Sequence, residues 1–230
     1  MTLWPAIFLS LQLAFFSTVI LIVVATPMAL WLAYTSSRLK PIFEAIFALP
    51  LVLPPTVLGF YLLLIMAPDA PLGQFWVSLT GGQLVFSFAG LLIATVVYSI
   101  PFAIQPLQTA FQTLDRRPFE AAKLMGATKW AIFRFLILPL SKRGFLAAMV
   151  LSFAHALGEF GVVLMVGGNI PGRTRVIAIE IYNRVETLDY RAAHQLSFGL
   201  LLFSFVVLFV SFALQRGALG SSTLSKGRTQ

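Results

Sequence analysis

The sequence contains no cysteine, only two histidines and only eight acidic residues among 230. The absence of cysteine excludes disulfides, thiolate catalysis and cysteine-ligated metals or clusters. His155 and His194, with scattered carboxylates, leave no credible metal centre or catalytic triad. No Gly-Lys dipeptide occurs, so the chain has no Gly-x-x-x-x-Gly-Lys-Ser/Thr phosphate loop. We therefore expect a chain that is not an enzyme on its own and that holds no cofactor.

Charge is also scarce. Only 10% of the residues are charged, 59% are hydrophobic, and the mean hydropathy is +0.91. A soluble core of this length cannot bury so much apolar surface, which indicates that the lipid bilayer is the solvent. The net charge of +8 is not accompanied by a basic stripe with interleaved aromatic residues, so we interpret it as charge in cytoplasmic loops and not as a nucleic-acid surface.

Long apolar runs fill most of the chain, and a membrane-crossing helix needs about 20 such residues. We predict an all-α, polytopic protein with a transmembrane domain over residues 1–216 and a flexible cytoplasmic tail over 217–230. The apolar start lacks a basic segment and a cleavage site, so we expect a retained span and not a signal peptide. The five predicted spans are residues 9–34, 42–66, 84–112, 144–166 and 196–215.

Prolines interrupt two of these spans. Pro50, Pro54 and Pro55 lie in the second, and Pro101 and Pro106 lie in the third. Each proline removes a backbone donor that hydrocarbon cannot replace, so these segments should kink and face protein or a cavity.

The distribution of Lys and Arg predicts the orientation. Most of the 16 basic residues fall in the first connection, the third connection and the C-terminal segment, whereas the N-terminus and the second connection hold none. Because cytoplasmic loops are enriched in Lys and Arg, this bias places the N-terminus outside and the C-terminus inside.

The third connection, residues 115–143, is long and basic but also patterned. Pro118 suits a first helical position and Gly126 a left-handed C-terminal cap, which together predict a short helix over residues 119–125. Thr128 is then expected to cap a second helix that returns towards the membrane, stopped by Pro139.

Two adjacent alanines, Ala121 and Ala122, give the short helix a low profile that can enter a groove on another protein. The alternative is an amphipathic helix that rests on lipid headgroups, held by Arg116, Arg117 and Lys123. The pattern alone does not decide between the two.

The segment Glu120-Ala121-Ala122, followed by Gly126 and by residues 136–139 (Leu-Ile-Leu-Pro), resembles the EAA signature of binding-protein-dependent ABC importer permeases. Leu136 departs slightly, since isoleucine is more usual there. The resemblance implies the type I ABC importer fold. It also implies that Glu120, Ala121, Ala122 and Gly126 form a coupling helix, seated in a cleft of a separate ATPase subunit that binds ATP and Mg.

Four further stretches, residues 49–61, 101–108, 157–161 and 168–174, resemble molybdate importer permeases, and sulfate permeases share the last two. This implies a homodimeric, multi-pass permease of the bacterial inner membrane, served by an extracytoplasmic molybdate-binding protein. A sulfate, thiosulfate or tungstate permease is the alternative within the class. An ion-coupled secondary anion transporter and a membrane scaffold whose basic loop recruits a cytoplasmic partner are alternatives from other classes.

The fourth span carries His155 and Glu159, which share a helix face and could pair. A carboxylate would repel a dianion, so we interpret Glu159 as holding its helix against a neighbour, with Gly158 and Gly161 permitting close approach. A proton-relay role is the alternative, although no second buried acid supports it.

No Lys or Arg lies near the middle of a span, so selectivity is expected from the external binding protein. Candidate pathway or packing residues beside the Pro-Pro break are Pro54, Pro55, Thr56 and Gly59. In the outer connection, Arg173 and Arg175 are candidates for docking the binding protein or attracting the anion, unless they are simply solvated.

Overall fold

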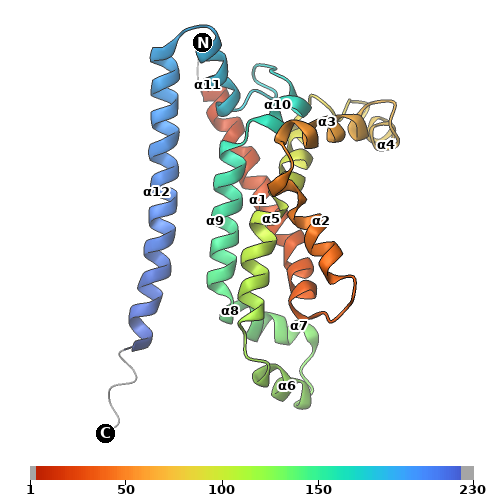
Figure 1. Ribbon diagram of the computed structural model, residues 1–230, viewed down its shortest axis with the longest axis vertical. Helices are drawn as coiled ribbons and strands as arrows, with labels where there is room; N and C mark the ends of the chain where they lie inside the picture. Colours follow the sequence, from red (N-terminus) through yellow and green to blue (C-terminus); the bar gives the residue numbers. More distant parts are fainter. Residues whose placement is uncertain (1–3, 224–230) are drawn as a thin grey trace.

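The computed structural model describes residues 4–223, with side chains described through residue 213. Every regular element in that part of the chain is helical (Figure 1), as the composition predicts. The elements are α1 (Trp4–Tyr34), α2 (Lys40–Val52), α3 (Pro55–Met66), α4 (Pro71–Thr80), α5 (Phe88–Gln112), α6 (Arg117–Leu124), α7 (Lys129–Ile132), the π-helix η1 (Phe133–Ile137), α8 (Leu138–Leu140), α9 (Lys142–Gly158), α10 (Gly161–Gly167), α11 (Ile177–Glu186) and α12 (Tyr190–Thr223).

Three single helices are long and apolar enough to cross a membrane, namely α1, α5 and residues 190–213 of α12. Two further candidate spans are pairs of helices joined by a bend. The second predicted span divides into α2 and α3 with an angle of 111° between them, and α7–α8 meets α9 at 74°. Counting each bent pair as one span gives five crossings, which is the predicted number. The second bent pair nevertheless starts at Lys129, inside the predicted loop 115–143, and ends at Gly158, before the predicted end of the fourth span.

The prolines act differently in the two spans that contain them. Pro54 and Pro55 end one helix and start the next, because Leu53 and Pro54 both adopt extended ψ angles near 135°. Pro101 and Pro106 remain inside the continuous helix α5, so they do not divide their span as Pro54 and Pro55 do. Pro101 is buried against neighbouring protein, which can compensate a lost backbone hydrogen bond.

Predicted helix ends also differ in the fourth span and at the C-terminus. The fourth span ends at Gly158, and Glu159 is extended with ψ 134°, so residues 161–167 form the separate helix α10. Helix α12 continues through Thr223, into the segment predicted to be a tail, whereas residues 224–230 lie outside the described part of the chain.

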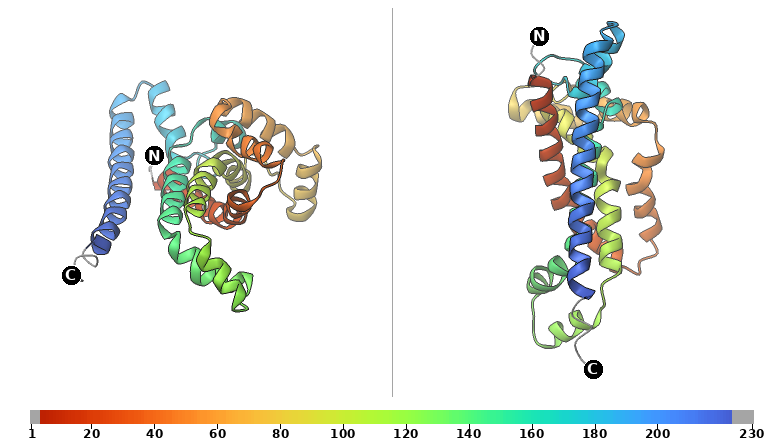
Figure 2. Two further views of the ribbon diagram at one scale, coloured as in Figure 1. Left: turned by 60° about the horizontal axis from the view of Figure 1, so that its bottom comes forward. Right: turned by 90° about the vertical axis from the view of Figure 1, so that its left-hand side faces the viewer.

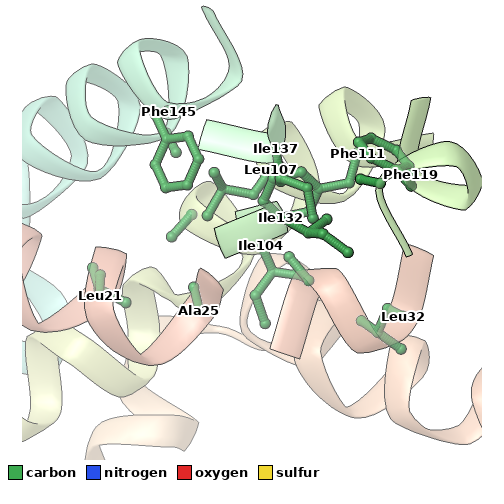
Figure 3. Packing of buried hydrophobic residues seen from close by; sticks show 14 residues of the cluster. Leu21, Ala25, Leu32, Ile104, Leu107, Phe111, Phe119, Ile132, Ile137 and Phe145 are labelled. Carbon is green, nitrogen blue, oxygen red and sulfur yellow. The ribbon is translucent and has the colours of Figure 1, made fainter. Parts of the chain in front are cut away.

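One apolar cluster joins the bundle of α1, α5 and α9 to the α6 segment (Figure 3). Buried alanines on α1, including Ala25 and Ala29, allow α5 to approach closely, and Phe111 of α5 meets Phe145 of α9 edge-on at 5.9 Å. The labelled members of the cluster are Leu21, Ala25, Leu32, Ile104, Leu107, Phe111, Phe119, Ile132, Ile137 and Phe145. The segment that follows α5 is therefore fixed to the membrane bundle by side-chain packing.

The two ends of the molecule are distinct. Helix α6 projects beyond one end of the bundle, and α10 and α11 cover the other (Figures 1 and 2). At that second end Ser10 Oγ of α1 accepts the Ile177 amide at 2.7 Å, which ties α11 to the start of α1. Helix α12 follows α11 and runs back along the outside of the bundle (Figure 1), with only 11% of its apolar window buried.

Candidate functional site

Helix α6 is framed by the local signals that the sequence predicts. Pro118 lies in its first turn, and Gly126 has φ +83°, the left-handed conformation that favours glycine. The Gly126 amide donates to Lys123 O, and the Ala127 amide donates to Ala122 O, both at 3.0 Å. This pair of hydrogen bonds is a Schellman motif, which satisfies carbonyls at the end of the helix and reverses the chain sharply.

The faces of α6 are divided between the protein and the exterior. Phe119 and Ala122 are buried in the apolar cluster, whereas Glu120, Ala121 and Lys123 are exposed. The two alanines thus lie on different faces of α6. We predicted that both belong to the low-profile outer face, but only Ala121 does. Glu120 lies on that same outer face.

Large apolar side chains are exposed on α6 and on the returning segment. Leu124 is 90% exposed and Met125 is 81% exposed, and Trp130 and Phe135 of the returning segment are also largely exposed. A membrane headgroup region or a groove on another protein can cover such a patch, whereas water alone leaves it uncompensated. The patch, Leu124, Met125, Trp130 and Phe135, is called the α6 patch below.

The start of α6 is attached to α1 and α5 through one tyrosine. Tyr34 Oη donates to Phe111 O at 3.0 Å, and the Arg116 guanidinium lies 5.7 Å from the Tyr34 ring centroid. A cavity of about 310 Å³ lies beside this contact, lined also by Glu120 and Lys123. Displacement of α6 would therefore be transmitted to the ends of two membrane helices.

The returning segment begins as predicted and then deviates. Thr128 Oγ1 accepts the Ala131 amide at 3.2 Å and caps α7. A π-helix follows over Phe133–Ile137, and its wider turn places Ile132 and Ile137, five residues apart, in the same apolar cluster. Pro139 lies within α8 and does not stop the segment, so the predicted end is wrong; the bend comes at Ser141.

The buried polar residues of α9 do not pair with each other. His155 Nδ1 lies 2.9 Å from Ser99 Oγ of α5, and the imidazole stacks on Phe102 with ring centroids 4.0 Å apart. Glu159 lies beyond the helix end, is only 5% exposed, and its two carboxylate oxygens make no hydrogen bond to the described residues. Thr95 of α5 faces this carboxylate without hydrogen-bond geometry between them. The predicted His155–Glu159 contact is therefore absent from the described part of the chain.

Two glycine-containing motifs far apart in the sequence pack against each other. A Cβ on Gly161 would lie 2.6 Å from Pro55 Cβ, and a Cβ on Gly59 would lie 2.8 Å from Met165 Cβ. Helices α3 and α10 are therefore in backbone-level contact. Gly158 has open space around it and does not serve close approach, contrary to our expectation, while Pro54 and Thr56 are exposed.

The two candidate docking arginines have different surroundings. Arg175 Nε donates to Asn169 Oδ1 at 2.6 Å, and Arg175 Nη1 lies 3.4 Å from Glu180 Oε2. Arg173 is exposed, and its side chain makes no hydrogen bond or ion pair with residues 4–213. Arg173 alone of the two keeps its donors free for another molecule.

Charged groups on α11 complete this outer network. Arg184 pairs with Glu180 at 2.8 Å and with Asp189 at 3.2 Å. The hydrogen bond and the charge of Glu180 raise the pKa of the Arg184 guanidinium above its usual range. The hydrogen bond that Tyr182 donates to Glu186 raises the pKa of the Tyr182 phenol.

Sequence reasoning missed several polar residues that the fold brings together. The Tyr34–Arg116 contact joins residues distant in sequence and has no local signal. Gln105 and Thr109 on α5 did carry a signal, because polar residues four apart mark one helix face. They line a cavity of about 660 Å³ between α5 and α9.

Residues 25–218 match the family model described as "Binding-protein-dependent transport system inner membrane component". The match covers most of the chain, so this protein belongs to that family of multi-pass inner-membrane transport permeases.

The chain is similar to individual permeases within this family to different degrees. The chain is 52% identical over 217 residues, 94% of this chain and 96% of the relative, to the "Molybdenum transport system permease protein ModB" of Azotobacter vinelandii. It is 31% identical over 176 residues to the "Sulfate transport system permease protein CysT" of Escherichia coli K12, covering 76% of this chain and 63% of that one. A permease fold of the same kind occurs in the MetNI methionine ABC transporter, solved in inward-facing conformations, with TM-score 0.72 and 17% identity over 94% of this chain and 95% of the other.

Proposed function

We propose that this chain is the membrane-spanning permease subunit of an ATP-driven ABC importer that carries molybdate into the cytoplasm. The observation that carries the proposal is the similarity to a molybdenum transport permease over nearly the full length of both chains. The sulfate relative is less similar and is matched over a smaller part of its length. Sulfate, thiosulfate and tungstate are therefore the alternative substrates.

ATP hydrolysis is assigned to a separate subunit. The chain has no Gly-Lys dipeptide for a phosphate loop, and the α6 patch offers an apolar docking surface beside the capped helix α6. Glu120, Ala121 and Gly126 contact that subunit in this proposal, with Leu124 and Met125 as apolar anchors. Ala122 acts from inside, by holding α6 against the bundle.

The assembly consists of two copies of this chain, two ATPase subunits and one external binding protein. The distribution of Lys and Arg supports an α6 end in the cytoplasm and an α11 end outside, where Arg173 faces the binding protein. ATP binding draws the two ATPase subunits together, and this movement displaces both α6 helices. The contacts of Tyr34 and Phe119 transmit the displacement to the membrane helices, which changes the side of the membrane to which the path opens.

The test is uptake by proteoliposomes that contain the purified chain and its ATPase, with the binding protein outside and ATP inside. We expect ATP-dependent accumulation of molybdate that requires all three proteins. Excess sulfate is the control for substrate. Uptake under a proton or sodium gradient without the ATPase would contradict the proposal and favour a secondary transporter, and accumulation of sulfate in place of molybdate would reassign the substrate.

A further inference from the structure

A groove of about 310 Å³ lies at the α11 end of the molecule, between the start of α1 and the first half of α12. Its apolar lining includes Ile7 and Leu11 of α1, Leu157 of α9, and Leu200 and Phe203 of α12. None of the described residues that line it is charged. Leu11 and Phe203 are exposed, and both helices that carry them are candidate membrane spans, so the groove is open to lipid.

The groove has two polar lining residues, and only one of them is free. The Ser10 hydroxyl donates to Ala6 O at 2.8 Å and accepts the Ile177 amide at 2.7 Å. Gln195 is exposed, and its side chain makes no hydrogen bond with residues 4–213. It lies in the second turn of α12, close to the α11 end. The groove therefore offers apolar contacts along its length and one free polar group at its α11 end.

Space for an apolar chain lies beside Gly199. This residue lines the groove, and an added Cβ would meet no atom within 4 Å. An empty apolar groove forfeits dispersion contacts, and water does not replace them because it finds too few hydrogen-bond partners there. Helix α12 lacks such contacts, since only 11% of its apolar window is buried. An apolar chain in the groove would join α12 to α1.

A tryptophan marks the level of the lipid headgroups at the same end. Trp4 precedes Ile7 and Leu11 by three and seven residues, so the three side chains share one face of α1. Trp4 is 75% exposed, and its indole makes no hydrogen bond with residues 4–213. Tryptophan is enriched where hydrocarbon meets the headgroups. The α11 end of the groove therefore lies at the level of the lipid phosphates.

Arg191 supplies a positive charge at this level. It is exposed, lies one helical turn before Gln195, and its side chain makes no hydrogen bond or ion pair with residues 4–213. The nearest acid in the sequence, Asp189, is paired with Arg184 at 3.2 Å, and its other oxygen accepts a backbone amide at 3.2 Å. Residues 168–195 contain four arginines and three acids, so this end carries a net positive charge. An anionic headgroup matches that charge.

We propose that the groove binds an anionic phospholipid from the leaflet on the α11 side. One acyl chain lies between α1 and α12 beside Gly199, and the phosphate accepts hydrogen bonds from the Arg191 guanidinium and the Gln195 amide. The Trp4 indole flanks the headgroup. The inference goes beyond the proposed function, because this lipid is a resident ligand that holds α12 and not a transported substrate.

The experiment measures lipid binding by native mass spectrometry of the whole chain, purified in detergent and titrated with phosphatidylglycerol or with phosphatidylcholine of the same acyl chains. We expect one phosphatidylglycerol per copy, bound about fivefold more tightly than phosphatidylcholine, because only phosphatidylglycerol carries a net negative charge for Arg191. Arg191→Gln should reduce that preference to within about twofold. Gly199→Leu should weaken binding of both lipids about tenfold, because the added side chain occupies the groove.

Two matched controls separate the site from general effects. Arg38→Gln removes an exposed arginine between α1 and α2, and Ser197→Leu adds a leucine at an exposed position of α12 that does not line the groove. Both should bind phosphatidylglycerol like the unmodified chain. Equal loss in a control and its matched variant, or equal affinity of the unmodified chain for the two lipids, would overturn the inference. Arg191→Gln leaves the groove unaltered, so it tests the headgroup contact even if Gly199→Leu fails to fold.

A second copy of this chain is the other occupant that the same measurement detects. Dimers that form without bound phosphatidylglycerol, and that Gly199→Leu dissociates, would overturn the proposal and assign the groove to contact between copies. Monomers and dimers that each retain one phosphatidylglycerol per copy would support the lipid site.

Discussion

Helices α6 and α11 are short amphipathic helices at opposite ends of the molecule (Figure 1), yet they treat their polar groups differently. On α11, Glu180 holds both Arg175 and Arg184, and Arg184 reaches on to Asp189. On α6, neither Glu120 nor Lys123 forms an ion pair within the described residues.

The apolar residues of α11 are also more completely buried than those of α6. Ile177 and Ile179 of α11 are buried, and α11 is bonded to the start of α1 through Ser10. Helix α6 buries Phe119 and Ala122 but ends in the largely exposed Leu124. Most charged groups at the α11 end pair within the chain, whereas charged and apolar side chains of α6 make no such contacts within the described residues. In the proposed function, docking at the α11 end uses groups without partners in the described chain, such as Arg173.

Removal of the apolar anchors of α6 should weaken ATPase docking strongly. The double variant Leu124→Asp, Met125→Asp should bind the ATPase subunit at least about 100-fold more weakly, because two side chains that each contribute about 1.5–3 kcal/mol on burial are lost. The measurement is association of the detergent-solubilised chain with its ATPase.

The matched control changes two exposed apolar residues at the other end, Leu188→Asp and Tyr190→Asp. These should leave ATPase binding unchanged. An equal loss in both double variants would mean that the α6 patch has no special role in docking and rests on lipid headgroups instead.

A smaller effect is expected from the helix cap. Gly126→Val forces a β-branched residue into a left-handed conformation that costs about 1–2 kcal/mol, so ATPase binding and ATP-dependent uptake should each fall about tenfold. Gly126→Asn should recover most of the loss, because asparagine tolerates this conformation.

Gly172 provides the comparison at the other end. It has φ +73° and, like Gly126, nothing within 4 Å of an added Cβ. Gly172→Val therefore imposes the same backbone strain, and it should leave ATPase binding intact. If Gly172→Val reduces ATPase binding as much as Gly126→Val does, general destabilisation explains both results.

The smallest expected effect concerns the two arginines of the outer connection. Arg173→Gln should weaken binding of the external binding protein by about threefold at low salt, with little difference at high salt, because an exposed charge acts over a screened distance. Arg175→Gln should leave that binding unchanged. It should lower the free energy of unfolding by up to about 1 kcal/mol, because it removes a partly exposed ion pair with Glu180. The opposite ranking in a binding titration would show that the internal network of Arg175 is the docking surface.

Local chemistry made the α6 segment predictable from sequence. Pro118, Gly126 and Thr128 act within four or five residues of themselves, and each occupies the cap or first-turn position that its side chain or backbone favours. The apolar runs similarly predict helical spans, since backbone groups in hydrocarbon must bond within their own segment.

Long-range packing limited the remaining predictions. The π-helix at Phe133–Ile137 depends on Ile132 and Ile137 both reaching a cluster formed by other helices. Glu159 lies beyond the end of α9, and His155 contacts Ser99 of α5. These conformations depend on neighbours that are distant in sequence. The spacing of four residues was compatible with a His155–Glu159 pair, but it carried no information on the neighbours that prevent the pair from forming.

The exposed α6 patch has a consequence for how cells produce this protein. A copy that has inserted into the membrane without a partner on this side exposes the side chains of Leu124, Met125, Trp130 and Phe135. Exposed apolar side chains favour aggregation and recognition by chaperones and proteases. Matched synthesis of the subunits would protect the chain, and overproduction of the permease alone should shorten its lifetime.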